Sequence, residues 1–133
     1  MDKQPLSVAL LDIDLFKRIN DEYGHQVGDD VLIDFALVLK KTVRPSDRIY
    51  RWGGEEFLIL LPHTTDEFSS AVCNRILMSL SDHNFAVVGN VTASIGLASM
   101  RANETSETVL QRADEYLYQA KDNGRNQVVM NEH

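Results

Sequence analysis

The sequence is poor in cysteine and proline, and it lacks any long apolar run. Because Cys73 stands alone, an internal disulfide is excluded and a reducing cytoplasm is the expected location. No apolar run exceeds five residues, and the one at Phe57 to Leu61 suits a buried strand, whereas a membrane span needs about 20 residues. Met1 to Pro5 is polar, so no signal peptide is predicted. We therefore expect no membrane contact by this domain, although a longer parent protein could carry an anchor before it.

Basic residues are scarce as well. Lys and Arg number 13 against 20 Asp and Glu, and the formal net charge is −7. A nucleic-acid-binding domain needs a basic surface, so no nucleic acid partner is expected, while small phosphate ligands stay possible. A chain of 133 residues is about one domain's worth, and it has no repeat, low-complexity segment or linker. We predict a single domain over residues 1–133.

The apolar patterns predict short strands that alternate with helices. Strands are expected at 6–11, 47–52, 55–61, 85–88, 91–100 and 127–130, and helices at 15–23, 30–43, 65–80 and 106–123. The resulting order is βααββαββαβ. It predicts an α+β fold with a ferredoxin-like or palm-like sheet of about five strands plus a hairpin, flanked by helices.

Capping and turn residues set the expected boundaries of these elements. Gly53-Gly54 separates two strand-like runs, which predicts a hairpin whose two turn residues have positive φ. Gly89-Asn90 predicts a second hairpin in the same way. The expected helix N-caps are Asp14, Asp29 and Thr64, the last in a capping box with Glu67, and the expected helix ends are Gly24, Arg44-Pro45 and Gly124.

Two carboxylates, Glu55 and Glu56, follow the Gly-Gly turn at once. Glycine leaves backbone that a bulky ligand can approach closely. Adjacent strand residues point to opposite faces, so we expect Glu55 on the ligand side and Glu56 on the other. Gly-Gly turns are common in hairpins, so this motif alone does not establish a site.

A second motif, LDIDLFKRIN, places Asp12 at the end of an apolar strand. A carboxylate there is costly unless it is paired or coordinates a metal. Asp14 is explained as a cap, and Lys17 and Asn20 lie one turn apart on the following helix. A carboxylate at a strand end, with a second one on a nearby hairpin, is how palm-type sites hold Mg²⁺ against a triphosphate.

Four segments resemble, in order, those of the GGDEF domains of diguanylate cyclases: LDIDLFKRINDEYGHQVGDDVL, RPSDRIYRWGGEEF, VTASIGLA and RADEYLYQAKDNGRNQV. GGEEF is an accepted form of the family signature, and the resemblance runs from about Leu6 to Val129. The family's usual first helix and DxLTxLxNR-like segment are absent from this sequence, as is any sensor or dimerisation module.

The resemblance implies that two GTP molecules condense to cyclic di-GMP and two pyrophosphates between two facing domains of a homodimer. It implies that Asp12, Glu55 and the backbone carbonyl of Ile13 bind Mg²⁺, for which Mn²⁺ can substitute. Glu55 is the implied general base, a role that metal activation could share. Lys17 would offset charge that develops on transfer. The implied substrate contacts are Asn20, His25, Asp29, Gly53, Gly54, Lys121 and Arg125.

The base choice and a control site follow from the same resemblance. A carboxylate at Asp29 can accept from guanine N1–H and the 2-amino group, which adenine does not offer. Arg44 and Asp47 form an RxxD tetrapeptide, the family's product-inhibition motif, to which Arg75 would add a contact. Without the family, Arg44-Pro45 is a helix stop and Asp47 begins a strand. The alternatives are a weakly active cyclic di-GMP-binding effector domain and a cyclase of altered base choice; the intact signature favours the GTP-using enzyme.

Overall fold

The structure is a computed structural model that describes residues 5–130. Its elements are β1 (Leu6–Ile13), α1 (Phe16–Tyr23), α2 (His25–Thr42), β2 (Arg48–Arg51), β3 (Glu56–Pro62), α3 (Asp66–Asp82), β4 (Ala93–Ser99), α4 (Ser106–Asp122) and β5 (Val128–Met130). The strands form one sheet in the order β2-β3-β1-β4-β5, with β1 in the centre. Strand β1 runs antiparallel to β3 and to β4, while β5 joins β4 in parallel. The first four strands have the ferredoxin-like order, so the predicted fold class is confirmed.

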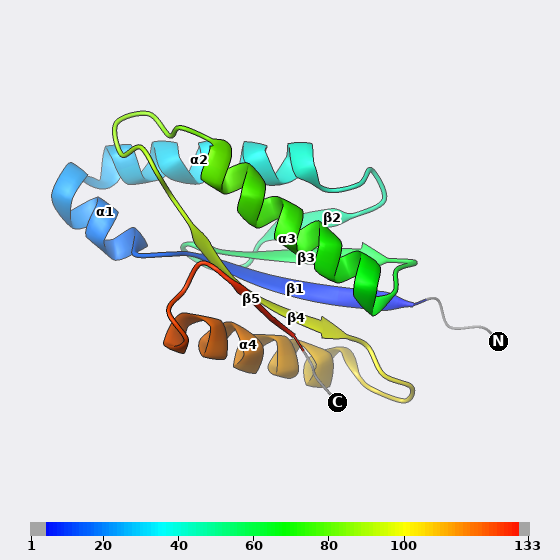
Figure 1. The fold of residues 1–133 in the computed structure, drawn as a ribbon. Helices are drawn as coiled ribbons and strands as arrows, with labels where there is room; N and C mark the ends of the chain where they lie inside the picture. Colours follow the sequence, from blue (N-terminus) through cyan, green and yellow to red (C-terminus); the bar gives the residue numbers. More distant parts are fainter. Residues whose placement is uncertain (1–4, 131–133) are drawn as a thin grey trace.

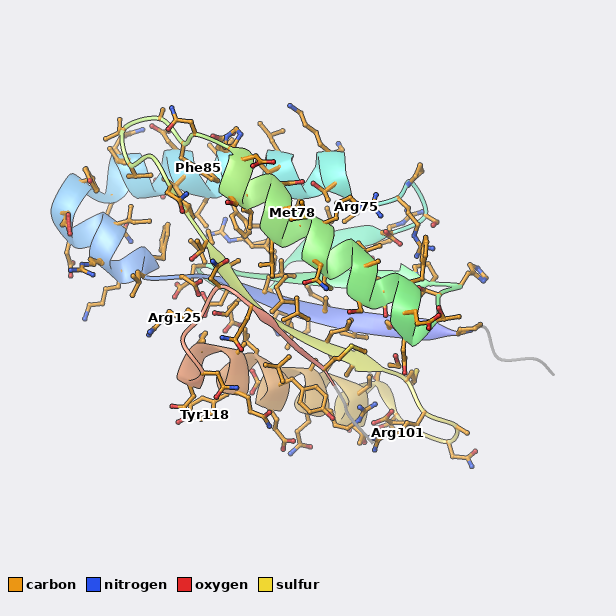
Figure 2. All side chains as sticks on the ribbon, in the orientation of Figure 1. Arg75, Met78, Phe85, Arg101, Tyr118 and Arg125 are labelled. Atoms are coloured by element: carbon orange, nitrogen blue, oxygen red, sulfur yellow. The ribbon has the colours of Figure 1, made fainter. Side chains whose placement is uncertain are left out.

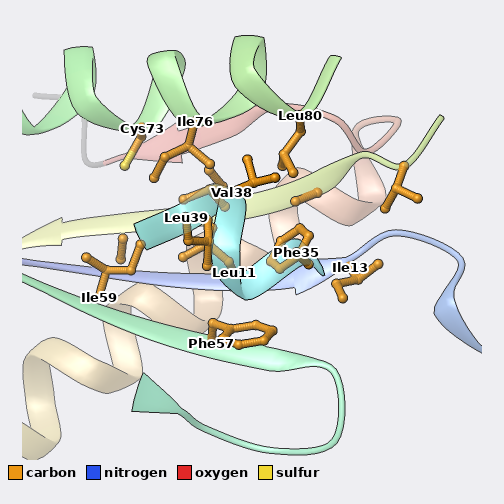
Figure 3. Close-up of a cluster of buried hydrophobic side chains, with 14 of the residues drawn as sticks. Leu11, Ile13, Phe35, Val38, Leu39, Phe57, Ile59, Cys73, Ile76 and Leu80 are labelled. Atoms are coloured by element: carbon orange, nitrogen blue, oxygen red, sulfur yellow. The ribbon is translucent and has the colours of Figure 1, made fainter. Parts of the chain in front are cut away.

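Helices cover both faces of the sheet: α2 and α3 lie on one side and α4 on the other (Figure 1). Strand β1 is buried on both faces, which explains its continuous apolar sequence. Its alternate residues Ala9, Leu11 and Ile13 pack in the larger cluster, with side chains of α2 and α3. Figure 3 shows part of this cluster, including Phe35 and Phe57. Val8 and Leu10 face the smaller cluster under α4.

Gly96 lets α4 rest directly on the sheet. A Cβ built on this β4 residue would lie 2.1 Å from the carbonyl oxygen of Ala113 and 2.3 Å from the amide nitrogen of Leu117. Both atoms belong to the helix backbone, which cannot turn aside as a side chain can. Any larger residue at position 96 would therefore push α4 off the strand.

The predicted strand at 85–88 is wrong, and with it the second hairpin. Residues in this segment form only an isolated bridge between Phe85 and Gly89, and β4 starts later, at Ala93. Phe85 is buried and packs edge-on against the His83 ring, with 4.6 Å between ring centroids. A short apolar run can fill a core from a loop as well as from a strand, and periodicity does not separate the two. The observed order is βααββαβαβ.

The predicted caps of the first two helices are also wrong. Leu15, with φ 58°, precedes α1 without a side-chain cap, and Asp14 hydrogen bonds elsewhere. Helix α2 begins at His25, so Asp29 lies one turn inside it. The reason is that Gly24, with φ 92°, ends α1 as predicted and also serves as the N-cap of α2, which leaves no room for a longer connection.

Two smaller differences from the prediction concern the N-cap of α3 and the Gly53-Gly54 hairpin. Helix α3 is capped by Thr65 rather than Thr64, since the Thr65 hydroxyl accepts from the Phe68 amide at 3.2 Å. The Gly53-Gly54 hairpin exists, but neither glycine has positive φ. The amides of Trp52 and Gly53 both donate to the Glu56 carbonyl, which makes a wider loop than the expected two-residue turn.

Candidate active site

Asp12 lies near the end of β1 and is 4% exposed. One carboxylate oxygen, Oδ2, accepts a hydrogen bond from Lys121 Nζ in the last turn of α4. The other oxygen, Oδ1, is buried and has no hydrogen-bond partner within residues 5–130. Burial raises the pKa of Asp12 above its usual value, and the Lys121 ammonium acts against that shift. A buried carboxylate oxygen left without a partner is costly, which points to a ligand or metal ion as its natural partner.

A cavity of about 440 Å³ opens beside Asp12. It brings together residues that are far apart in the sequence: the end of β1, the start of α1, the loop before β3, and the end of α4. Six of the predicted site residues line it: Asp12, Ile13, Lys17, Glu55, Lys121 and Arg125. Figure 2 shows Arg125 on the loop between α4 and β5, at the end of the sheet from which α1 leaves.

Glu55 and Glu56 take positions that simple strand alternation does not give. Glu55 precedes β3 and lines the cavity, and its carbonyl accepts from the Ile13 amide at 3.3 Å. Glu56, the first residue of β3, pairs in register with Asp12, so both lie on the same face of the sheet. Burial, and then the Asp12 charge, raise the pKa of Glu56. The expectation that Glu56 points to the face opposite the ligand side is wrong, because alternation does not extend into the loop that holds Glu55; of the two, Glu55 is the one that lines the cavity.

The donor set fits a hard divalent cation. Mg²⁺ prefers oxygen ligands and usually keeps several waters or substrate oxygens. Within residues 5–130, no group of three or more His, Cys, Asp or Glu side chains is arranged to hold a metal. A cation here would therefore combine the Asp12 and Glu55 carboxylates with the Ile13 carbonyl and oxygens from a nucleotide or water.

Asn20 on α1 is half-buried beside α2, and its Oδ1 has no hydrogen-bond partner in the described part of the chain. The side chain fits there because position 28 is glycine. A Cβ built on Gly28 would lie 1.8 Å from Asn20 Oδ1 and 3.3 Å from the Phe16 ring. Gly28 was not singled out from the sequence, since a mid-helix glycine gives no signal of which side chain it accommodates.

Asp29 lines a different, mostly apolar cavity of about 610 Å³ between α2 and the β2–β3 hairpin. Leu32, Ile33 and Phe57 are among the residues that share it. Asn20 packs at the α1–α2 contact against Gly28, and Gly28 directly precedes Asp29 on α2. His25 is exposed at the start of α2 and lines neither cavity.

Arg51 holds the glycine loop and was missed as a site residue. Its Nε donates to the carbonyls of Gly53 and Gly54, each at 2.9 Å. The same side chain lines the apolar cavity with Asp29 and lies 6.0 Å from the centroid of the Phe57 ring. Its position in the RWGGEEF motif was visible in the sequence, but nothing there indicates that a residue before the turn would bond back to both glycine carbonyls.

The sequence profile described as "Diguanylate cyclase, GGDEF domain" matches residues 1–127. The chain belongs to the GGDEF domain family of diguanylate cyclases. It is 47% identical over 131 residues to the response regulator PleD of Caulobacter vibrioides, covering 94% of this chain and 29% of PleD. It is 42% identical over 132 residues to diguanylate cyclase A of Treponema denticola, covering 96% of this chain and 36% of that protein. The chain thus spans about a third of the length of these relatives.

The fold agrees with solved GGDEF domains. The crystal structure of the GGDEF domain of DgcB from Caulobacter crescentus, in complex with c-di-GMP, superposes with a TM-score of 0.91 at 33% identity. The match covers 96% of this chain and 78% of that one. In this GGDEF domain, no helix within residues 5–130 has the length and apolar character to cross a membrane.

The RxxD residues of this GGDEF domain are bound to each other. Arg44 donates from Nη2 to Asp47 Oδ1 at 2.6 Å and from Nε at 3.0 Å, and its backbone amide donates to Oδ2 at 2.8 Å. Nη2 also donates to the Pro62 carbonyl, and the guanidinium lies 5.0 Å from the Phe68 ring centroid. The pair borders a cavity of about 440 Å³, whereas Arg75 on α3 lines a separate one of about 470 Å³.

Proposed function

We propose that this GGDEF domain condenses two GTP molecules into cyclic di-GMP with release of two pyrophosphates. The observation that carries the proposal is the buried Asp12 Oδ1, without a partner in residues 5–130, beside a cavity that Glu55, Lys17 and Arg125 also line. The cavity combines carboxylates for a cation with cations for phosphates, which is the composition that phosphoryl transfer requires.

Asp12, Glu55 and the Ile13 carbonyl would hold Mg²⁺, or Mn²⁺ in its place. When bound, the cation supplies charge stabilisation to the triphosphate. Lys17 and Arg125 would contact the phosphates, and Lys17 would offset the charge that develops at the α-phosphorus. Lys121 already neutralises Asp12 and would share in the phosphate contacts. Glu55 would accept the proton of the attacking 3′-hydroxyl.

The reaction needs two domains that face each other, each with one GTP. The 3′-oxygen of one nucleotide forms a bond to the α-phosphorus of the other, and the bond from that phosphorus to the pyrophosphate breaks. A second, symmetric attack closes the ring. Holding the two nucleotides in this orientation supplies most of what the protein adds beyond the charged groups.

Guanine would be read by Asn20 and Asp29, with Arg51 holding the Gly53-Gly54 loop beside it. Asp29 would accept from N1–H and the 2-amino group, so ATP would leave this carboxylate unpaired. His25 would lie next to the bound nucleotide. Cyclic di-GMP would bind as an intercalated dimer at Arg44 and Asp47, with Arg75 of a neighbouring domain, and hold the two active sites apart.

The test is product analysis with purified protein, GTP and Mg²⁺, alongside Glu55→Gln. The parent should form cyclic di-GMP from GTP and little product from ATP, and Glu55→Gln should be inactive with an unchanged circular dichroism spectrum. Asp29→Ser should relax the base preference. Near-parent activity of Glu55→Gln would refute the roles given to Glu55. A parent that binds cyclic di-GMP without turning over GTP would instead be an effector domain.

A further inference from the structure

The carboxylate of Asp14 joins three parts of the chain that are far apart in sequence. Its Oδ1 accepts from the Ser94 hydroxyl at 2.6 Å, and its Oδ2 accepts from the Thr92 hydroxyl at 2.6 Å. Oδ2 also accepts from the Asn126 amide at 3.0 Å. Asp14 is 7% exposed, and its own amide donates to the Thr92 carbonyl at 2.9 Å. The β1–α1 loop, the approach to β4 and the α4–β5 loop therefore meet at this side chain.

The bond to Asn126 matters because the backbone there is unusual. Gly124, Arg125 and Asn126 all have positive φ, of 117°, 65° and 50°. For residues other than glycine, this left-handed region costs roughly 1–2 kcal/mol each. The Arg125 amide donates to the Ala120 carbonyl at 2.9 Å, which continues from the helix end. The next amide along, Asn126, is held by the Asp14 carboxylate from across the site.

Arg125 depends on this backbone for its position. It lines the Asp12 cavity, yet its guanidinium makes no hydrogen bond or ion pair with any residue in the range 5–130. Lys121, one turn earlier, is fixed by its bond to Asp12. The Arg125 charge acts on Asp12 through space, and the conformation of residues 124–126 sets the point of the backbone from which its side chain reaches the cavity.

We propose that Asp14 is a positioning residue that holds Arg125 toward the nucleotide phosphates through the Asn126 amide. Asp14 directly follows Ile13, one of the proposed Mg²⁺ ligands. Its carboxylate would therefore fix the position of the Arg125 side chain relative to these ligands. The inference rests on the proposed function, since it assigns Arg125 to GTP. Asp14 lines the same cavity as Asp12, but both of its carboxylate oxygens already accept from protein donors, so in this proposal it acts through Arg125 and not as a ligand.

A purely structural Asp14 would lower stability without acting through Arg125, and a double-mutant cycle separates the two cases. The probe is guanosine 5′-(α-thio)triphosphate with Mg²⁺, measured by calorimetry on Asp14→Asn, Arg125→Ala and the double variant. Loss of a hydrogen bond to a charged group predicts about tenfold weaker binding for Asp14→Asn. The double variant should bind no more weakly than Arg125→Ala alone. Fully additive losses would overturn the inference.

Glu104→Gln is the matched control, because it removes a nearly buried carboxylate that pairs with Arg112, away from the cavity. It should lower stability and leave nucleotide affinity unchanged. If Asp14→Asn does not fold, Thr92→Val removes the hydroxyl that shares Oδ2 with Asn126 and should produce a smaller loss of the same kind.

Amide hydrogen exchange, followed by NMR without nucleotide or metal, gives a second measurement. Asp14→Asn should speed exchange at Asn126 far more than at the core strand β1, while Arg125→Ala should leave it as in the parent. Exchange at Asn126 that is unchanged in Asp14→Asn overturns the inference alone. A parent protein that does not bind the nucleotide probe overturns the proposed function, and the inference with it.

Discussion

Arg44 and Asp47 form an ion pair in which two guanidinium nitrogens of Arg44 donate to the Asp47 carboxylate. The Asp47 side chain is fully buried and the Arg44 side chain is 22% exposed. The same guanidinium bonds to the Pro62 carbonyl, so the pair fastens the α2–β2 loop to the end of β3. The RxxD residues thus have a structural role in addition to any role in product binding.

Asp47→Ala should destabilise the protein by about 3–5 kcal/mol, because it leaves a charged partner without compensation in a largely buried setting. Urea unfolding at pH 7 measures the change. Lys40→Ala, an exposed change near the end of α2, is the control and should stay within about 0.5 kcal/mol of the parent. Equal stability of the two variants would show that the pair does not hold the loop.

Product binding can be tested at the same pair with the fold preserved. Arg44→Lys keeps the charge but loses the planar fork that can engage Asp47 and a phosphate or guanine edge. We expect calorimetry to give at least tenfold weaker binding of cyclic di-GMP, without a comparable loss of GTP affinity. Parent-like affinity would return Arg44 and Asp47 to a structural role only.

Gly28→Ala should weaken GTP binding by displacing Asn20, whose Oδ1 occupies the space of the new methyl group. The loss of GTP affinity should equal that of Asn20→Ala, and the double variant should bind GTP no more weakly than either single variant. Stability should change little, because the end of the Asn20 side chain can turn away. GTP titrations and thermal unfolding of the three variants check this. Parent-like GTP affinity of Gly28→Ala would exclude Asn20 as a base contact.

The acid stability of the domain should depend on Glu104. Its hydrogen bonds from Arg112 lower the pKa of this carboxyl from 4.5 to about 2. A lowered folded-state pKa contributes stability above pH 4.5 that is lost as the pH falls toward 2. Glu104→Gln should therefore be less stable at neutral pH and should lose less stability across that window. Glu107→Gln, an exposed change on the same segment, should follow the parent curve in unfolding experiments.

Specific activity should rise with protein concentration if two domains must meet for turnover. Initial rates across a hundredfold dilution series measure this, with GTP held saturating. Joining two copies through a flexible linker should reduce the dependence, because it raises the effective concentration of one domain at the other. A flat specific activity in the unlinked protein would argue against two half-sites.

The sequence predicted the fold class and most helix and strand positions, because β1 and β3 carry short continuous apolar runs while α2 and α4 carry apolar residues at helical spacing. It also predicted that Asp12, Lys17, Glu55, Lys121 and Arg125 share one site, through the resemblance to a family. It did not predict the contacts of Asp14, since a residue that could cap a helix gives no sign of a bond to Asn126. The sequence predicted a strand at Phe85, because a short apolar run does not show whether its residues fill the core from a loop or from a strand.

The seating of α4 on Gly96 limits how the domain can be controlled. With helix backbone pressed against strand backbone, α4 cannot slide to carry Lys121 toward or away from Asp12 without lifting off the sheet. The side chains of the proposed site are then already in place within one domain. In the proposed two-domain reaction, an activating signal would therefore act on how two domains meet rather than on the arrangement inside one domain.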